Sequence, residues 1–352
     1  MSRIVVTGGL GFIGSHTVVE LLSNNYDVVI IDNLSNSSTD VMNGIKNITG
    51  KEPELHLFDL NDQVKVLDFF KNNKDIAGII HFAAYKAVGE SVQLPIKYYE
   101  NNLFSLVNIM KAVNEFNLNL NFIFSSSCTV YGQAEVQPVD ENTPSQPAES
   151  PYGNTKQICE EILRDYTVSA DNLNIISLRY FNPIGAHPTS EIGELPLGKP
   201  NCLVPYLTQS VAGVLGQLTV FGDDYNTPDG TCLRDYIDVI DLSKAHVAAL
   251  QKLENGKDNP KYDVFNLGTG NGTSVLEVIQ TFENATGEKV NYRIGPRRSG
   301  DVESVYARTD KAFELLNWTA TTPLSESLIN AWNWEQKIRG IKKEQNVLQS
   351  TM

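Results

Sequence analysis

The sequence has few cysteines, few positive charges and no long hydrophobic run, and each shortage excludes a class of protein. Its cysteines are scattered, form no CxxC pair and number only four: Cys128, Cys159, Cys202 and Cys232. We therefore expect free thiols in a reducing cytoplasm rather than a disulfide framework. The five histidines do not fall at ligand spacing, so we expect no bound metal.

The charge balance and hydropathy exclude two further classes. Lys and Arg number 28 against 42 Asp and Glu, a net charge of -14, which argues against a nucleic-acid-binding face but permits a locally positive pocket. No apolar run is long enough to cross a bilayer. The chain passes from MSR straight into IVVTGG, so we expect no signal peptide. The sequence is therefore typical of a soluble globular protein.

Apolar, β-branched runs alternate with helical-period segments through the first half of the chain. Alternation of this kind predicts right-handed βαβ units and a parallel sheet. We expect strands at 3–6, 26–31, 54–58, 76–81, 121–125 and 174–178, and helices at 13–22, 64–71 and 105–114. After Phe181, the stretch NPIGAHPTSEIGELPLGKPN predicts a long functional loop, because it is rich in Pro and Gly. A last helix is expected near 325–338.

The first expected strand ends in TGGLGFIGSH, which reads as GxGxxG with the glycines Gly9, Gly11 and Gly14, or as GxxGxxG from Gly8. Glycine lets the backbone approach a pyrophosphate, and the helix that starts at Phe12 offers its N-terminal N–H groups to an anion. Asp32 ends the second strand, where a carboxylate binds ribose hydroxyls and repels a 2′-phosphate, which favours NAD over NADP. A simple tight turn also explains a lone GxGxxG; the strand, helix and acid around it favour the dinucleotide.

Two further stretches fit a cofactor that lies along the strand ends. Asp59 and Leu60 end the third strand, where they could reach the adenine. In HFAAYKAVGES, the small side chains of Ala83 and Ala84 would let a dinucleotide pass, and Lys86 could reach the nicotinamide side. Ordinary packing explains each of these residues taken alone.

Tyr152 and Lys156 in PYGNTK are spaced i, i+4 and share one helix face, and Pro151 suits the first turn. A phenol needs help to act as a base at neutral pH, and a neighbouring ammonium favours the phenolate. Ser127 in FSSSCTVYG could hydrogen-bond the same substrate oxygen. Taken alone, a Y-x-x-x-K match is explained by an exposed aromatic beside a solvated lysine. For Ser125 and Ser126, a polar strand end is the simpler explanation.

These residues together resemble the extended short-chain dehydrogenase/reductase family. Further stretches occur in the order found in UDP-glucose (UDP-galactose) 4-epimerases: KAVGES, SSSCTVYG, PYGNTK, RYFNPIGAHP, FGDDY, GTCLRDYI and PRRSGDV. The resemblance runs from Arg3 to about Trp334. It implies interconversion of UDP-galactose and UDP-glucose, in galactose metabolism, by transient oxidation at sugar C4, rotation of the 4-keto sugar and hydride return. It also implies tightly bound NAD, with Tyr152 as general base, Ser127 as its partner and Lys156 on the nicotinamide ribose.

The resemblance assigns two sets of binding residues. Those at the cofactor are Gly8, Gly11, Phe12, Ile13, Gly14, Asp32, Asn33, Asn36, Ser37, Asp59, Leu60, Phe82, Ala83, Ala84, Lys86, Asn101, Ser125, Tyr152, Lys156 and Phe181. Those at the UDP-sugar are Lys86, Ser127, Tyr152, Asn182, Cys202, Leu203, Thr219, Val220, Phe221, Arg234, Arg298, Asp301 and Val305. A bound diphosphate calls for guanidinium groups, which Arg234 and Arg298 supply.

Four positions depart from the family pattern. Cys202 stands where many members have a second asparagine, Tyr85 replaces a leucine expected beside the nicotinamide, and Asp238 replaces a histidine. Val305 occupies a gate position near the sugar 2-position, where a bulky tyrosine tends to exclude N-acetylhexosamines. The smaller valine predicts that UDP-GlcNAc and UDP-GalNAc are also accepted.

Two other functions compete with epimerisation. A 4,6-dehydratase or UDP-glucuronate decarboxylase of the same fold typically carries carboxylic acids beside the serine, where this chain has Cys128 and Thr129. A non-catalytic NAD-binding regulator would usually have lost the tyrosine or the lysine. Both features favour the epimerase.

The expected architecture is α/β, a Rossmann-type doubly wound parallel sheet with a smaller α/β substrate-binding lobe. We expect residues 1–182 to bind NAD, with 234–268 returning to this domain. Residues 183–233 and 269–340 would form the UDP-sugar lobe, and 341–352 a polar tail. The family implies a homodimer, with 96–116 and 152–169 as the paired helices.

Overall fold

A seven-stranded parallel sheet forms the centre of the fold in a computed structural model, which describes residues 1–256, 260–298 and 301–341. The strand order is β11-β6-β5-β4-β1-β2-β3. Its strands are β1 (Arg3–Thr7), β2 (Asp27–Asp32), β3 (Glu54–Leu57), β4 (Ile76–His81), β5 (Leu120–Ser127), β6 (Leu173–Tyr180) and β11 (Tyr262–Leu267). Chain order reverses between β1 and β4, which places a binding crevice at the carboxyl ends of these strands. The expected Rossmann-type doubly wound sheet is confirmed.

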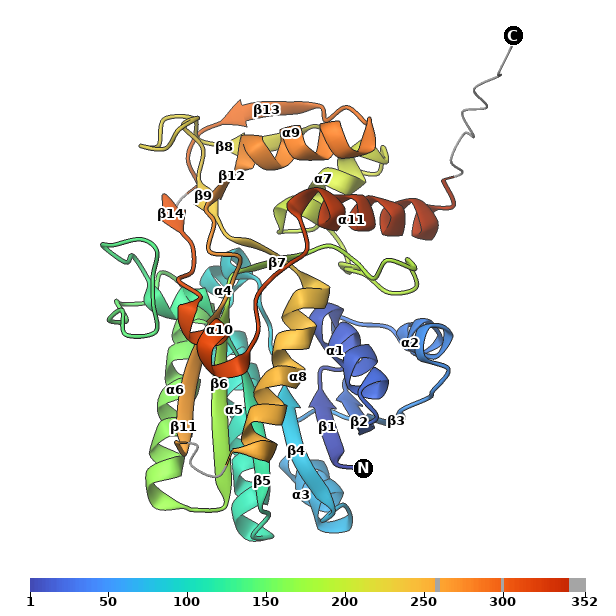
Figure 1. The fold of residues 1–352 in the computed structure, drawn as a ribbon, viewed down its shortest axis with the longest axis vertical. Helices are drawn as coiled ribbons and strands as arrows, with labels where there is room; N and C mark the ends of the chain where they lie inside the picture. The colour runs from blue at the N-terminus through green and yellow to red at the C-terminus, as the bar shows by residue number, and fades with distance from the viewer. Residues whose placement is uncertain (257–259, 299–300, 342–352) are drawn as a thin grey trace.

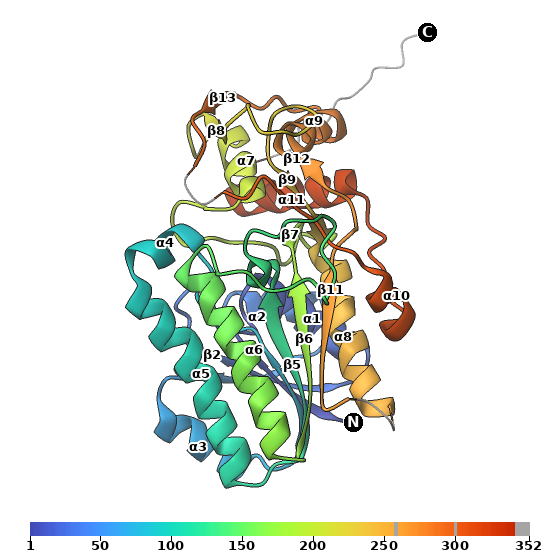
Figure 2. The same ribbon diagram turned by 90° about the vertical axis from the view of Figure 1, so that its left-hand side faces the viewer.

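Helices cover both faces of the sheet (Figures 1 and 2). The cluster that holds Ile4 and Val6 packs under α1 and α8, whereas the cluster that holds Val5 packs under α3, α5 and α6. Successive strand residues point to opposite faces, so burial on both faces explains the continuous apolar runs. The helices are α1 (Phe12–Ser23), α2 (Val41–Thr49), α3 (Gln63–Asn72), α4 (Val88–Gln93), α5 (Pro95–Glu115), α6 (Pro151–Ser169), α8 (Val239–Asn255) and α10 (Asp310–Leu316).

The expected strands and helices are all present, with shifted ends. The largest difference is α5, which begins at Pro95 rather than near residue 105. Proline suits the first turn of a helix because it needs no N–H partner there. The polar stretch KYYENN that follows hides the apolar period, although Tyr98 and Asn102 within it are buried.

A smaller cluster of helices and short strands lies beyond the carboxyl ends of the sheet, at the top of Figure 1. Its core contains Leu207, Val220, Phe282 and Trp332. Its elements are β7 (Asn182–Ile184), α7 (Leu203–Val211), β8 (Leu218–Phe221), β9 (Leu233–Arg234), β10 (Tyr236–Asp238), β12 (Thr273–Ser274), α9 (Val275–Thr286), β13 (Tyr292–Gly295), β14 (Ser304–Val305) and α11 (Leu324–Arg339). Between β10 and β12 the chain returns to the sheet as α8 and β11.

The stretch between β7 and α7 forms the expected long loop. It is anchored by α11, because the Trp334 ring covers Gly193 so closely that a Cβ there would lie 2.5 Å from Trp334 Cδ1. Trp334 Nε1 also donates a hydrogen bond to the Glu194 carbonyl at 2.9 Å.

Across the described part of the chain, no helix combines the length and the hydropathy of a membrane span. Nearly all of the expected polar tail, 342–352, lies outside the described residues.

Candidate active site

The glycine turn between β1 and α1 is built so tightly that side chains are excluded. Gly8 has a φ of +68°, and a Cβ on Gly14 would lie 2.2 Å from the Gly8 carbonyl oxygen. Gly11 caps α1 without a side chain. The first-turn amides, including those of Phe12 and Ile13, are therefore offered to an anion, as a dinucleotide pyrophosphate requires.

The Asp32 carboxylate fixes this turn to the end of β2. Asp32 is buried, and it accepts hydrogen bonds from Leu10 N at 3.0 Å, Leu34 N at 2.9 Å and Ser37 Oγ at 2.8 Å. A carboxylate has about four acceptor positions, so room remains for a ribose hydroxyl. The residues present therefore fit the adenosine half of NAD.

Amide side chains lie next to Asp32, at the carboxyl ends of the strands. Asn33 Nδ2 donates to Asp59 Oδ2 at 3.1 Å, and Asn61 Nδ2 donates to Asn101 Oδ1 at 3.3 Å. Asn61 Oδ1 is buried without a hydrogen-bond partner among the described residues, an orphaned acceptor that a bound ligand can satisfy. Leu60 is buried and Asn36 is exposed.

The segment after β4 passes close to the glycine turn. A Cβ on Gly8 would lie 2.9 Å from Ala83 N, and the Phe82 ring centre is 4.7 Å from that of His246. Asn102 holds the next residues, since its Oδ1 accepts from Tyr85 N at 2.8 Å and its Nδ2 donates to Tyr85 O at 3.0 Å. Sequence reasoning does not identify Asn61 or Asn102; the pair NN in YYENN is a signal for Asn102, and no comparable signal marks Asn61.

Helix α6 brings Tyr152 and Lys156 to the carboxyl end of β5. Ser150 caps the helix by accepting from Gly153 N at 3.2 Å. Tyr152 and Lys156 are 8% and 4% exposed. Lys156 Nζ donates to the Ser125 carbonyl at 2.5 Å and lies 6.0 Å from the centre of the Tyr152 ring.

Ser127 completes this constellation from the last position of β5. It is buried, and its Oγ accepts from Thr129 N at 3.3 Å at the start of the 3-10 turn η1 (Cys128–Tyr131). The Ser127 side chain acts to lower the pKa of Tyr152, against the larger effect of burial. Ser125 Oγ hydrogen-bonds Tyr180 OH, and the neighbouring Phe181 is buried. The strand end and the helix therefore converge in one buried polar site.

Burial dominates the electrostatics of this site. It raises the pKa of Tyr152 well above its ordinary value; the nearby Tyr180 and Cys128 act in the same direction, while the Ser127 hydrogen bond and the Lys86 ammonium oppose it. Burial lowers the pKa of Lys156 to about 8. In the protein alone, then, desolvation outweighs the acidifying effect that the sequence reasoning expected a lysine to have on this tyrosine.

A second set of polar groups lies beside the strands of the smaller cluster. Arg298 Nη2 donates to Asp301 Oδ1 at 2.6 Å, and Arg234 Nη2 lies 3.9 Å from the same oxygen. Phe221 of β8 is half exposed, and its ring centre is 5.5 Å from Arg298 Cζ. The two arginines thus converge on one carboxylate, an arrangement that can reorganise around a diphosphate.

The remaining expected substrate residues lie in several elements of the smaller cluster. Val305 pairs with Arg234 in the β9–β14 ladder, is 8% exposed and packs with Val130 and Phe181. Cys202 caps α7, which begins at Leu203, without a side-chain hydrogen bond, whereas asparagine would cap well. Thr219 and Val220 lie in β8, and Asn182 N donates to Asp235 O at 2.9 Å.

The two other departures from the family pattern have local explanations. The Tyr85 ring packs against α5, 5.7 Å from the Tyr98 ring centre and 4.5 Å from Lys97 Nζ. Asp238 caps α8 by accepting from Ile240 N at 2.8 Å, and it also accepts from Ser327 Oγ at 2.6 Å. It therefore joins α8 to α11.

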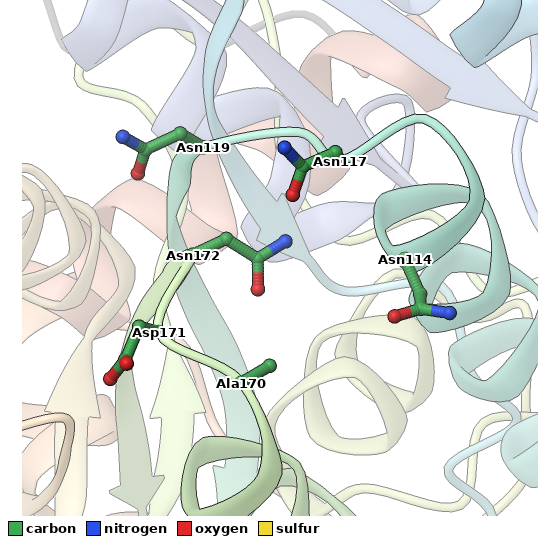
Figure 3. A pocket seen from close by; sticks show the side chains of 6 residues that line it. All are labelled: Asn114, Asn117, Asn119, Ala170, Asp171 and Asn172. Carbon is green, nitrogen blue, oxygen red and sulfur yellow. The ribbon is translucent and has the colours of Figure 1, made fainter.

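A surface hollow lies at the amino ends of the strands, at the opposite end of the sheet from Tyr152 (Figure 3). It is lined by Asn114, Asn117, Asn119, Ala170, Asp171 and Asn172. These residues surround the amino ends of β5 and β6 and are remote from Tyr152, so the hollow is not part of the site.

Within the described ranges, no three His, Cys, Asp or Glu side chains are grouped to hold a metal ion.

The chain is similar along almost its whole length to known sugar-nucleotide enzymes. The family model for GDP-mannose 4,6 dehydratase matches residues 5–330. A UDP-glucose 4-epimerase of Bacillus subtilis is 47% identical over 340 residues, which cover 96% of this chain and 98% of that protein.

Solved structures agree with this result. A UDP-glucose 4-epimerase of Stenotrophomonas maltophila, with bound NAD and formylated UDP-arabinopyranose, is 41% identical with a TM-score of 0.92, over 97% of this chain and 100% of that one. The enzyme of Bifidobacterium longum, in complex with NAD+ and UDP, is 44% identical with a TM-score of 0.91, over 96% and 98%.

Proposed function

The chain belongs to the UDP-glucose 4-epimerase family, and from this membership we propose how its own residues perform the reaction. It is an NAD-dependent isomerase that interconverts UDP-galactose and UDP-glucose. The observation that carries the residue assignment is the convergence of Tyr152, Lys156 and Ser127, all buried, at the carboxyl edge of the sheet.

We assign the adenosine and pyrophosphate of NAD to the glycine turn, Asp32 and the amide-lined edge that contains Asn33, Asn61 and Asn101. Three observations support this assignment: the tight Gly8–Gly14 contact, the absence of a side-chain cap at the start of α1, and the unpaired acceptor of Asn61. When bound there, NAD would supply the acceptor and donor of the hydride at sugar C4 and, in its oxidised form, a positive charge.

In this proposal Tyr152 takes the proton of the sugar 4-hydroxyl as the C4–H bond breaks, and it returns that proton after the 4-keto sugar has turned. Ser127 donates a hydrogen bond to the same sugar oxygen. Lys156 holds the nicotinamide ribose and favours the phenolate, which the buried phenol otherwise resists. Each group ends the cycle in its starting protonation state.

The UDP part is assigned to the polar groups of the smaller cluster. Arg234 and Arg298 would bind the diphosphate, with Asp301 holding both guanidinium groups in place before substrate arrives. The remaining contacts are assigned to Lys86, Asn182, Cys202, Leu203, Thr219, Val220 and Phe221. Val305 lies in the strand beside Arg234, and we propose that its small side chain admits N-acetylated UDP-sugars.

A dehydratase reaction is disfavoured by the two residues after Ser127. Elimination of water needs an acid and a base there. Burial raises the pKa of Cys128 to about 12, so its thiol stays neutral, and Thr129 Oγ1 is buried without a partner among the described residues. Neither group can move the required proton. A non-catalytic regulator would have no need of the intact Tyr152–Lys156–Ser127 set.

Three further assignments extend the proposal to the whole chain. We place NAD on residues 1–182 with 234–268, and the UDP-sugar on 183–233 with 269–340, since α8 and β11 pack with the sheet. We propose a homodimer through α5 and α6. The four unpaired cysteines suit a reducing cytoplasm.

One incubation tests the proposal. Purified protein should convert UDP-galactose to UDP-glucose with no nucleotide added, because NAD stays bound through the cycle. Tyr152→Phe should lower kcat by at least a thousandfold and retain NAD. Absence of conversion even with NAD supplied would contradict the proposed function.

A further inference from the structure

A buried polar cluster lies directly behind the proposed site, between α6, β5 and β6. We define it by Ser126, Tyr131, Glu160, Arg179 and Asn266, none of which the reaction itself uses. Glu160 is 3% exposed and Arg179 is 6% exposed. A buried ion pair costs more free energy in desolvation than it regains unless its hydrogen bonds are complete. The presence of the buried Glu160–Arg179 pair beside the site therefore calls for an explanation.

Glu160 is the centre of the cluster and joins three elements. Its carboxylate accepts from Arg179 Nε at 2.9 Å and from Arg179 Nη2 at 2.6 Å, a bidentate pair. Ser126 Oγ donates to the same carboxylate at 2.5 Å. Ser126 and Arg179 are register partners on neighbouring strands. The carboxylate on α6 thus fixes the strand residue that precedes Ser127.

The cluster also holds the segment that follows Ser127. Arg179 Nη1 donates to Tyr131 OH at 3.1 Å, and Tyr131 OH donates to Asn266 Oδ1 at 2.6 Å. Tyr131 ends the turn η1, which starts immediately after Ser127. Residues on both sides of Ser127 are therefore connected to the Glu160–Arg179 pair.

Lys156 lies one helical turn before Glu160 on the same face of α6. Its Nζ donates to the carbonyl of Ser125, the residue before Ser126. We propose that Glu160 is a positioning residue, which acts through Ser126, Arg179 and Lys156 to hold the Ser127 hydroxyl and the Lys156 ammonium where Tyr152 needs them. This inference rests on the proposed roles of Tyr152, Lys156 and Ser127.

The negative charge of Glu160 also acts on Lys156. Burial lowers the pKa of Lys156, while Glu160 and Cys159 oppose that shift. The titratable groups that interact with Lys156 are His81 of β4 and Tyr152, Cys159 and Glu160 of α6, and Arg179 of β6 is paired with Glu160. Burial holds His81 neutral, and burial raises the pKa of the Cys159 thiol to about 12. Glu160 is therefore the carboxylate that sustains the Lys156 charge.

The test is Glu160→Gln, which keeps the shape and removes the charge. We expect kcat for UDP-galactose to fall at least tenfold with KM within threefold of wild type, since the UDP contacts lie elsewhere. The alkaline limb of the kcat–pH profile should move to lower pH by about one unit, because Lys156 loses its proton more easily. Ser126→Ala keeps the ion pair and removes one contact, and should lower kcat three- to fivefold without shifting the profile.

The matched control is Glu335→Gln. Glu335 is equally buried, and it accepts from Arg339 Nε at 2.8 Å on α11, away from the site. Its loss should lower the melting temperature and leave kcat and the pH profile unchanged. An unshifted profile and a wild-type kcat in folded Glu160→Gln would overturn the inference alone; if that variant does not fold, a wild-type kcat in Ser126→Ala would overturn it. A wild-type protein without epimerase activity would overturn the proposed function as well.

Discussion

Lys86 and Glu194 form an ion pair, with Nζ and Oε1 3.1 Å apart, that joins the loop after β4 to the long loop after β7. Glu194 is itself fixed, because Trp334 Nε1 donates to its carbonyl. Burial raises the pKa of Tyr152 and of Tyr180, and the Lys86 ammonium acts in the opposite direction on both. The pair therefore holds a cation beside the proposed base.

Glu194→Gln should lower kcat/KM for UDP-galactose about five- to tenfold, because Lys86 loses the group that positions it. The measurement is steady-state epimerase kinetics at one pH and ionic strength. Glu191→Gln is the control, since Glu191 lies in the same loop but pairs with Lys337 of α11 at 2.6 Å. Equal losses in the two variants would show that general loosening of the loop, rather than the Lys86 contact, causes the effect.

Asp238 gives the protein a pH-dependent stability. Burial raises the pKa of Asp238 from 3.8 to about 6, although its hydrogen bonds with Ser327 and Ile240 oppose the shift. The folded state then binds more protons than the unfolded state between these pH values, so this group's stabilisation is lost as pH rises from about 4 to about 6.

Asp238→Asn should remove this dependence of the unfolding free energy on pH and stabilise the protein at pH 7 by up to roughly 3 kcal/mol. Asparagine can still cap α8, and Ser327 can accept from its amide. The measurement is urea unfolding at several pH values from 4 to 7. Parallel stability–pH curves for the two proteins would refute the assignment.

The parts of the fold that sequence predicts are those set by local pattern. The alternation of apolar strands and helical periods predicts the sheet from β1 to β6, and the glycine spacing predicts the turn before α1. The start of α5 was missed because KYYENN shows no apolar period; its buried side chains serve tertiary contacts, such as Asn102 with Tyr85. The Glu160–Arg179 pair was missed for a related reason. The two residues are 19 positions apart, with Glu160 on α6 and Arg179 on β6, and only the packing of that helix on the sheet brings them together.

Val305 offers a direct test of substrate range. Val305→Tyr should lower kcat/KM for UDP-GalNAc at least tenfold and leave that for UDP-galactose within about threefold, because the larger ring would fill the space beside the sugar 2-position. Val305→Ala is the control and should retain both activities. Because Val305 packs with Val130, Tyr131 and Phe181, melting temperatures must confirm that the tyrosine variant is folded. Wild-type turnover of UDP-galactose with none of UDP-GalNAc would contradict the prediction.

The paired helices α5 and α6 carry the surface that we assign to the dimer. Phe104 on α5 is 54% exposed and Ile96 is 66% exposed, a large apolar area for two helices that already pack on each other. A second copy of the same face would bury both residues by two-fold symmetry. The charge of a glutamate cannot be buried there without a partner.

Phe104→Glu should therefore shift the protein from the mass of two chains to that of one, as measured by light scattering during gel filtration at micromolar concentration. Phe313→Glu is the matched control, because Phe313 on α10 is 61% exposed and α10 packs on α8 and β11, on the other face of the sheet. The control should remain dimeric. If wild type is monomeric, or if Phe104→Glu and Phe313→Glu both retain the dimer, then α5 and α6 do not form the interface, and their exposed apolar residues need another explanation. Loss of the dimer with retained NAD and retained kcat would place the complete site within one chain, as expected from a Tyr152 that lies on the buried face of α6 and not on the face presented to the partner.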